Sequence, residues 1–391
     1  MRESKRPKKR PRRDGPEKAL PRQLDIAGAL ARAKRRDPKD NGRPLVWAFV
    51  TLLLLTLVGV LGFAAIYPTN KGPGAGKLAE LTFAQETQGA ALADAVCARE
   101  LVQSCAMFKW YARLTGLRAG VGVHVLFDDM SPGEIALRLD RRGAHQKVTF
   151  PEGFTRFDMA KRLEEKRVTS SILFLKATED GALLTELAIK GKSAEGYLFP
   201  ATYEFVGNAD PHEIVRKAKR EFDRRWATLN ERYGSEVLEL QSSLNFGQAE
   251  IVTLASMVEK EARIDDERPL VASVFLNRLR EPSFTPKLLQ CDPTAAYGCL
   301  TMRGAIPSCA EFNGKVTAAM VHDSANPYST YTHEGLPPGP IANPGYRSLD
   351  AVVSAPKSKY LYFVAKGDGR HTFSESYDAH NAAVRGGKKG R

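Results

Sequence analysis

The sequence predicts an α+β protein with a single N-terminal transmembrane helix, then a small mixed domain, then a larger mixed α+β domain. Three observations support this prediction. An uncharged apolar run covers Leu45–Tyr67, and helical patterns alternate with short strand patterns after about residue 77. The composition, 43% hydrophobic and 26% charged residues, is that of an ordinary globular protein. The chain beyond the apolar run is long enough for about two domains.

The apolar run is long enough to cross a bilayer, since about 20 apolar helical residues span the hydrocarbon core. Trp47 near its start and Tyr67 at its end suit the two membrane interfaces. The alternative is a cleaved signal peptide, whose apolar core covers only about 7–15 residues after a short basic region. The run at 45–67 therefore predicts a retained single-pass anchor. The glycine-rich residues 68–76 that follow predict a flexible linker.

The positive charge is concentrated before the anchor. Residues 1–43 hold 16 basic and 6 acidic side chains, a net charge of +10 out of +13 for the whole chain. A basic segment beside an apolar helix favours a cytoplasmic tail, and it suits anionic lipid headgroups. Nucleic-acid binding is the other interpretation of such a run. It is disfavoured because the rest of the chain is almost neutral. We expect residues 1–43 to be a disordered cytoplasmic tail, and residues 386–391 a short basic C-terminal tail.

Five cysteines follow the anchor, in what we expect to be an oxidising compartment. They are Cys97, Cys105, Cys291, Cys299 and Cys309. The pairs Cys97–Cys105 and Cys299–Cys309 are candidate local bridges, although the connectivity cannot be read from the sequence and an odd count leaves at least one thiol over. No C-x-x-C pair occurs and the histidines show no ligand spacing, so we expect no metal and no cofactor.

Local signals divide the remainder into a small domain at 77–149 and a larger one at 150–385. In the first, Ser131 before Pro132 predicts a helix start. The patterns further along predict a strand over Val148–Gly153 that enters a turn, helices over Thr155–Leu163, Pro211–Leu229, Glu250–Arg263 and Val271–Leu279, and a strand over Tyr360–Ala365. Gly367–Gly369 then predicts a turn into a return strand over His371–Phe373.

One helical segment carries a candidate catalytic carboxyl group. In the pattern over Ala249–Ile264, Glu261 follows Met257 by four residues and Val258 by three, so its neighbours on the helix surface are mostly apolar. Asp265 adds a like charge four residues on. Both features disfavour the ionised carboxylate and are expected to raise the pKa of Glu261.

A second carboxyl group in the same segment has a different environment. Glu259 has Arg263 four residues on, which predicts a solvated ion pair. Glu259 and Glu261 lie about 200° apart around the helix, so they cannot both point into one site. The pattern favours Glu261, but a solvated face that carries both residues stays open.

Two irregular segments carry groups that suit carbohydrate recognition. The loop Pro327–Gly345 contains five prolines and three glycines, together with aromatic and hydroxyl side chains. Such rigid loops offer apolar faces and hydrogen bonds to a sugar ring, although a purely structural loop is the equal alternative. Leu289–Thr294 is a similar polar turn, in which Asp292 could instead serve only as a helix cap.

Taken together, these segments resemble the YceG-like family of endolytic murein transglycosylases. The motifs that carry the resemblance are Glu195–Pro200, Ala255–Glu261, Val271–Leu279, Leu289–Thr294, Gly335–Gly345, Tyr360–Ala365 and His371–Phe373. A weaker match over Phe108–Leu163 resembles the LysM-like membrane-proximal domain of that family, and a single anchor is also the family's layout. The resemblance implies a LysM-like domain at 77–149 and a YceG-like catalytic domain at 150–385.

The resemblance also implies a catalytic residue and a reaction. The family's catalytic glutamate is the second one of its Glu-Lys-Glu segment, which is Glu261 here. The implied reaction cleaves the MurNAc–GlcNAc bond within nascent peptidoglycan strands, leaves 1,6-anhydro-MurNAc ends and terminates elongation. The implied substrate-binding residues are Glu195, Gln290, Asp292, Thr294, Tyr328, Thr330, Tyr331 and His371. The alternatives are a muramidase that hydrolyses the same bond and a non-catalytic glycan-binding scaffold.

The family's layout implies a location and partners. The protein is expected in the bacterial inner membrane, with its amino terminus in the cytoplasm and its catalytic domain outside. Its partners are expected to be glycan strands and penicillin-binding proteins or other wall synthases, and no nucleic acid. Three positions depart from the family's motifs. The family commonly has Asp where this chain has Ala201, Ser or Thr where it has Cys291, and Asn where it has Ser329.

Overall fold

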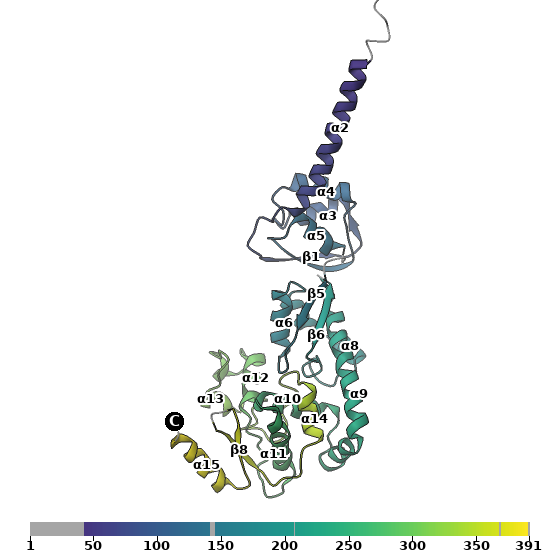
Figure 1. The fold of residues 1–391 in the computed structure, drawn as a ribbon. Helices are drawn as coiled ribbons and strands as arrows, with labels where there is room; N and C mark the ends of the chain where they lie inside the picture. Colours follow the sequence, from purple (N-terminus) through teal and green to yellow (C-terminus); the bar gives the residue numbers. More distant parts are fainter. Residues whose placement is uncertain (1–42, 141–144, 207, 367–368, 390–391) are drawn as a thin grey trace, which may run out of the picture. The chain divides into compact units, whose positions relative to one another are not determined.

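The computed structural model describes residues 43–140, 145–206, 208–366 and 369–389 (Figure 1). The basic tail before Arg43, with its predicted disorder, lies outside the described residues, as do residues 367–368 of the predicted turn. The chain divides into two compact units, Met1–Ile66 and Tyr67–Arg391. The observed fold is mixed α+β and mostly helical, in agreement with the predicted class.

The first unit contains the long apolar helix α2, Arg43–Ile66. With its short 3-10 extension to Thr69 it is the only described helix that is long and apolar enough to cross a membrane. Its 24 residues extend about 36 Å at the usual rise per residue, which exceeds the hydrocarbon thickness of a bilayer. The apolar helix is confirmed, and its composition is consistent with either a membrane anchor or a signal sequence.

The second unit begins with the 3-10 turn Tyr67–Thr69 and a small α/β domain. Strand β1 (Leu78–Phe83) pairs antiparallel with β4 (Gly122–Phe127). Between them lie α3 (Gly89–Cys97), α4 (Cys105–Thr115) and the short pair β2 (Thr87–Gln88) and β3 (Arg118–Ala119). Helix α5 (Pro132–Leu139) follows. The predicted helix start is confirmed, since Ser131 and Glu134 form a reciprocal capping box.

The residues that were predicted to be a flexible linker are instead bound to this domain. The backbone N–H groups of Gly72 and Gly74 donate to the carbonyl oxygens of Asp129 (3.2 Å) and Asp128 (2.9 Å). Gly76 donates its N–H to the Asp128 carboxylate at 2.7 Å. The linker prediction is therefore wrong for these residues, because their backbone polar groups are satisfied by the loop after β4.

The larger domain starts with a two-stranded antiparallel sheet, β5 (His145–Thr149) against β6 (Thr202–Val206). Three helices connect these strands: α6 (Arg156–Glu165), α7 (Ser171–Thr178) and α8 (Gly181–Glu186). The predicted strand starts earlier than expected and ends at Thr149. Thr155 caps α6 as predicted, through a reciprocal capping box with Asp158.

Four helices then pack into the main hydrophobic core. They are α9 (Pro211–Leu244), α10 (Gln248–Glu261), α11 (Arg268–Arg280) and α14 (Tyr346–Val353). Helix α9 continues well beyond the predicted end at Leu229, with non-helical dihedral angles at Tyr233. Helix α10 ends earlier than predicted, because the next residue, Ala262, is extended. Pro269 opens α11 rather than breaking it, since the first turn of a helix needs no N–H donor there.

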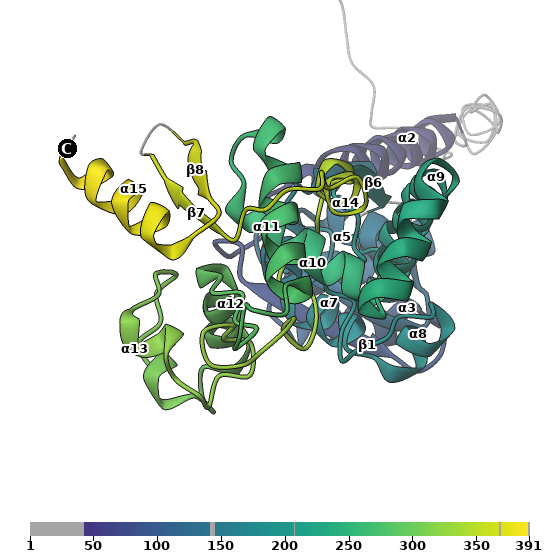
Figure 2. The ribbon, with the colours of Figure 1, turned by 90° about the horizontal axis from the view of Figure 1, so that it is seen from below.

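Two smaller pieces flank these helices. Strands β7 (Tyr362–Ala365) and β8 (His371–Ser374) form the predicted antiparallel hairpin, and α15 (Tyr377–Lys389) packs on it. Figure 2 shows this hairpin beside α11 and the segment with α12 and α13 beside α10. Helix α15 extends through most of the stretch that was predicted to be a C-terminal tail.

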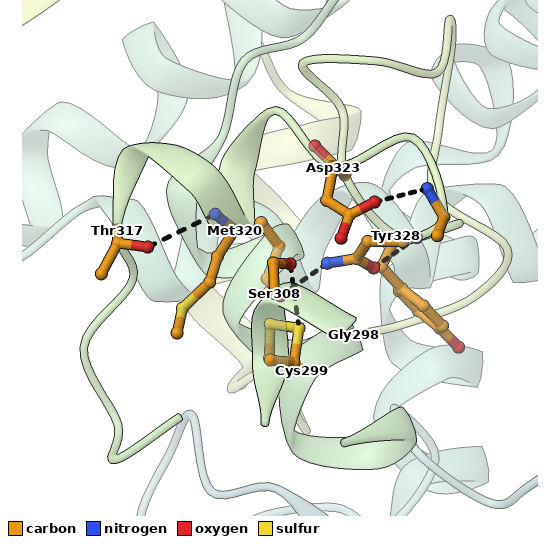
Figure 3. Close-up of a disulfide and its surroundings, with 12 residues drawn as sticks. Gly298, Cys299, Ser308, Thr317, Met320, Asp323 and Tyr328 are labelled. Carbon is orange, nitrogen blue, oxygen red and sulfur yellow. Dashed lines mark hydrogen bonds between the residues drawn. A yellow bond between two sulfur atoms is a disulfide. The ribbon is translucent and has the colours of Figure 1, made fainter. Parts of the chain in front are cut away.

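The α12–α13 segment contains little regular secondary structure, and a disulfide bond crosslinks it. Its elements are α12 (Asp292–Met302), the 3-10 turn Pro307–Cys309 and α13 (Ala318–Val321). Cys299 binds Cys309, with Ser308 and Met320 nearby (Figure 3). Cys97 binds Cys105 between α3 and α4. Both candidate bridges are thus confirmed, and the remaining cysteine, Cys291, is a buried free thiol.

Candidate active site

The helix that carries Glu261 is largely buried. All eight residues from Ile251 to Val258 are buried, including Thr253 and Ser256. The middle of helix α10 therefore lies inside the core, and its first and last turns are partly exposed. Glu261 is the last residue of the helix and is partly exposed. This placement gives the carboxyl group a mostly apolar surrounding with one side open.

A turn from a distant part of the chain lies against this helix end. The turn is shaped by hydrogen bonds to its backbone: Arg278 donates to the Leu289 carbonyl (2.6 Å), and the Cys291 N–H donates to the Thr330 hydroxyl (3.0 Å). Thr294 donates its hydroxyl to the Cys291 carbonyl at 2.6 Å. These bonds place Cys291 at the cap of α12, close enough for its thiol to hydrogen-bond with the Glu261 carboxyl group.

Burial raises the pKa of Glu261 above its usual value, because removal from water disfavours the carboxylate. The hydrogen bond from the Cys291 thiol lowers the pKa, the negative charge of Asp292 raises it, and the positive charges of His371 and Arg278 lower it. The net shift is upward. Glu261 therefore retains a proton more readily than an exposed glutamate does, which is a property that a general acid needs.

The like charge beside Glu261 comes from Asp292, and not from Asp265 as the helical spacing suggested. Asp265 lies beyond the end of α10 and binds Arg268 at 3.0 Å and also Arg347. The prediction from spacing is wrong because the helix stops before Asp265.

Several predicted site residues do lie around Glu261. Asp292 is exposed and accepts a 2.5 Å hydrogen bond from the Tyr331 hydroxyl group. Burial, followed by the bond to Asp292, raises the pKa of Tyr331. Gln290 is exposed, has a left-handed backbone (φ 49°) and donates its N–H to the Thr330 carbonyl. His371, at the start of β8, is close enough to Glu261 to affect its pKa.

Two predicted substrate-binding threonines are buried and hold the loops together. Thr294 and Thr330 are 0% and 1% exposed, and their hydroxyl oxygens lie 3.0 Å apart. They join the start of α12 to the proline-rich loop. Both side chains are buried in this structure, and their role in substrate binding stays a prediction.

Glu195 is also placed inside the domain, where it is 2% exposed. Its carboxylate accepts hydrogen bonds from the Arg156 N–H (3.0 Å), the Tyr297 hydroxyl (3.0 Å) and the Asn343 side-chain amide (2.7 Å). Burial raises its pKa to about 7. Tyr328 packs its ring against Tyr297, with centroids 5.1 Å apart. Glu195 and Tyr328 thus both contact Tyr297, Glu195 from the interior and Tyr328 from a partly exposed position.

The predicted solvated ion pair of Glu259 is wrong. The side chain of Glu259 is 5% exposed and binds Arg268 at 3.1 Å. It also accepts hydrogen bonds from the Gly345 N–H (3.0 Å) and the Ser348 hydroxyl (2.8 Å). Glu259 therefore joins α10 to α11 and α14, while Glu261 faces α12 and β8. The prediction that the two carboxyl groups face different surroundings is confirmed.

Three further residues of the site were not among the predicted ones. Arg278 lies beside Glu261, Glu267 binds His371, and Asn343 binds Glu195. Arg278 and Asn343 stand within motifs that carry the family resemblance, so those motifs held a usable signal. Glu267 lies in none of them, and its role depends on a contact across 104 residues.

The positions that depart from the family's motifs are accommodated in different ways. Ser329 is fully buried, donates to the Val321 carbonyl and accepts from the Tyr331 N–H at 3.3 Å. Cys291 supplies the thiol beside Glu261, and Ala201 contributes a backbone carbonyl to the Phe150 N–H. Within the described residues, no three acidic, histidine or cysteine side chains form a group suited to a metal ion.

Comparisons with known proteins give a consistent result. A family model described as the YceG-like family matches residues 81–386. A protein of Bacillus subtilis (strain 168) named endolytic murein transglycosylase is 34% identical over 192 residues, which is 48% of this chain and 46% of that protein. A Streptococcus pneumoniae protein of the same name (serotype 2, strain D39) is 27% identical over 315 residues, 73% of this chain and 54% of that protein.

This chain therefore spans about half the length of the curated relatives it matches. One solved structure is also similar, a 2.6 Å crystal structure of a yceG-like protein from Listeria monocytogenes. The TM-score is 0.50 at 25% sequence identity, and the match covers 79% of this chain and 99% of that one.

Proposed function

Because the chain belongs to the YceG-like family, we propose that it is an endolytic peptidoglycan transglycosylase with Glu261 as its catalytic residue. The substrate in this proposal is the MurNAc–GlcNAc bond within nascent glycan strands. The observation that carries the proposal is the environment of Glu261, a partly exposed carboxyl group with a raised pKa at the end of a buried helix. The names of the relatives support the same reaction class.

In the proposed reaction, protonated Glu261 gives its proton to the leaving glycosidic oxygen as general acid. An oxocarbenium-like transition state forms at C1. The 6-hydroxyl of the same MurNAc residue then attacks C1, and the Glu261 carboxylate takes up the hydroxyl proton. The products are a GlcNAc end and a 1,6-anhydro-MurNAc end, and Glu261 returns to its starting state. Each cleavage terminates the elongation of a strand.

A muramidase is the second candidate, because Asp292 places another carboxyl group beside Glu261. Hydrolysis of glycosides normally uses two carboxyl groups, one of which activates water or attacks the sugar. In the transglycosylase the nucleophile belongs to the substrate, so one carboxyl group is enough. Asp292 is held by the Tyr331 hydroxyl and, in our proposal, it binds the glycan together with Gln290, Tyr331 and His371.

The remaining parts of the chain fit this function in the following way. Helix α2 anchors the protein in the inner membrane, with the basic tail in the cytoplasm and the folded domains outside. The small domain around β1 and β4 is LysM-like and binds glycan strands. Penicillin-binding proteins or other wall synthases are the protein partners. These three assignments are proposals that follow from the family's layout.

The test is digestion of purified, uncrosslinked glycan strands by the full chain in detergent micelles, with mass spectrometry of the new ends. Wild-type protein is expected to produce 1,6-anhydro-MurNAc ends. Glu261→Gln is expected to slow cleavage by roughly 10²–10⁴-fold and to retain strand binding. Glu231→Gln, which changes an exposed glutamate of α9, is the matched control and is expected to behave as wild type.

The possible results separate the candidate functions. Cleavage that leaves reducing ends and no anhydro ends would establish the muramidase. Strand binding without any cleavage by the wild-type protein would favour the non-catalytic scaffold. Full activity of Glu261→Gln would contradict the assignment of Glu261.

A further inference from the structure

Glu267 is a buried carboxyl group that the proposed reaction does not use. It is the last residue of the 3-10 turn Asp265–Glu267, directly before α11, and it is 6% exposed. It binds His371 at three points: both carboxylate oxygens accept from the His371 backbone N–H at 3.1 Å, and Oε2 lies 2.9 Å from the ring nitrogen Nδ1. Glu267 therefore fixes both the backbone and the ring of His371.

The ring of His371 is held on its other sides by aromatic residues. Its centroid lies 5.3 Å from that of Phe363 in an edge-on arrangement, and 6.2 Å from that of Phe373. The second ring nitrogen, Nε2, has no hydrogen-bond partner among the described residues. The side chain is 9% exposed, and Nε2 retains some contact with solvent. The ring is thus fixed, with one nitrogen engaged and the other accessible.

The chemistry of the partner decides which ring nitrogen carries hydrogen. An ionised carboxylate only accepts hydrogen bonds, so Nδ1 must donate to Glu267 and must carry a proton. In the neutral ring Nε2 is then the free acceptor, and in the charged ring both nitrogens are donors. His371 is close enough to Glu261 to act on it electrostatically.

We propose that Glu267 is a positioning residue of the site, which fixes the His371 ring with Nδ1 protonated and Nε2 accessible beside Glu261. This inference rests on the proposed function. As Glu261 passes its proton to the leaving oxygen it becomes a carboxylate, and the ring of His371, held in one orientation nearby, helps to stabilise that state. His371 keeps its protons throughout, and Nε2 is available to hydrogen-bond with the sugar.

The neighbouring charges allow a matched comparison. Arg370 lies 3.8 Å from Glu267 and also donates two hydrogen bonds of 3.3 Å to Asp266. Asp266 stands in the same 3-10 turn as Glu267, but its side chain is exposed and does not bind His371. Glu261 in turn faces Asp292, Arg278 and the Cys291 thiol. A loss of charge at Asp266 therefore leaves in place the contacts between Glu267 and His371 and the groups around Glu261. It serves as the control.

The test uses the full chain in detergent micelles with ¹⁵N-labelled histidine, and compares Glu267→Gln with Asp266→Asn. NMR of the His371 ring nitrogens is expected to show a protonated Nδ1 in the wild type and in Asp266→Asn, and a reduced protonated fraction in Glu267→Gln. Cleavage by Glu267→Gln is expected to show a kcat that is roughly 10- to 100-fold lower, with a KM within about twofold of wild type. Glu267→Asp, which keeps the charge, should restore most of the Nδ1 signal and guards against a folding defect.

A double-mutant cycle completes the test. If Glu267 acts through His371, adding Glu267→Gln to His371→Asn should change kcat by less than about twofold. If the two substitutions instead lowered kcat independently, so that their fold-changes multiplied in the double variant, the inference would be overturned. An unchanged kcat in Glu267→Gln, or an Nδ1 signal equal to that of wild type, would also overturn it. The NMR measurement needs no substrate, so it reports on the pair even if the wild-type protein fails to cleave and the proposed function is wrong.

Discussion

The side-chain amide of Asn343 donates a 2.7 Å hydrogen bond to Glu195, across 148 residues of chain. The amide oxygen of Asn343 also accepts from the N–H groups of Gly196 and Leu198, both at 2.9 Å. One asparagine thus joins two of the motifs that carry the family resemblance. These motifs, although separated in sequence, form one structural unit in the interior.

Replacement of Asn343 by alanine should destabilise the domain. The change leaves two buried backbone N–H groups without an acceptor, at about 1–3 kcal/mol each. We expect the free energy of unfolding, measured by urea denaturation, to fall by roughly 3 kcal/mol. Asn230→Ala, at an exposed position of α9, is the control and should change it by no more than about 0.5 kcal/mol. Equal stability of the two variants would contradict the role of Asn343.

Glu195 should make stability depend on pH. Its pKa is raised from 4.5 to about 7 in the folded protein, so its contribution to stability is complete below pH 4.5 and is lost as the pH rises through 7. The loss amounts to about 3 kcal/mol. Urea denaturation of wild type and Glu195→Gln between pH 4.5 and 8 measures it. As the pH rises, the wild type should lose unfolding free energy relative to Glu195→Gln. A difference that is independent of pH would rule out the raised pKa.

Glu259 and Glu261 should differ in their effects on stability. Glu259→Gln removes the buried carboxylate partner of Arg268 and leaves only the more exposed Asp265, so the cost should approach the roughly 3–5 kcal/mol of a broken buried ion pair without reaching its upper end. Glu261→Gln replaces a carboxyl group whose charge is disfavoured by burial, so its unfolding free energy near neutral pH should equal or exceed that of wild type. Denaturation of both variants by urea is the measurement. A large loss of stability in Glu261→Gln would show that its carboxylate has a structural role.

The residue at position 291 should set the pH range of activity. A hydroxyl group is a stronger hydrogen-bond donor than a thiol, so Cys291→Ser should stabilise the Glu261 carboxylate and lower its pKa. The general acid then loses its proton at lower pH, and the alkaline limb of the kcat/KM profile should move to lower pH. Cys291→Ala removes the donor, and its alkaline limb should move up. Shifts in the same direction for both variants would exclude control through this hydrogen bond.

How well the sequence predicts a feature of the site depends on how far apart along the chain the contacting residues lie. The apolar spacing around Glu261 is local, so the raised pKa of this residue could be expected from Met257 and Val258. The partner of Glu259 could not be, because α10 ends at Glu261 and brings Arg268 back from the next helix in place of Arg263. A projection of the sequence onto a helix assumes that the helix continues. Helix α10 instead stops at Glu261, in the turn that carries the candidate catalytic residue.

The same limit explains the other differences. The glycines after helix α2 suggest a flexible segment. Their N–H groups are instead bound by oxygens of Asp128 and Asp129, which lie about 50 residues further along the chain. Glu195 stands in a motif that carries the family resemblance, and its burial among three hydrogen-bond donors becomes evident only in the fold. Hairpin and capping signals were predicted well because each one is complete within a few residues.

The directions of two helices add a final consequence at the site. Glu261 is the last residue of α10, and Asp292 is the first residue of α12. The peptide dipoles of a helix leave its C-terminus partly negative and its N-terminus partly positive. A negative charge on Glu261 therefore stands at the repelling pole of its own helix, whereas one on Asp292 stands at the attracting pole. Chain polarity thus distinguishes two chemically similar side chains, and at Glu261 it acts in the same direction as the burial that raises the pKa of this residue.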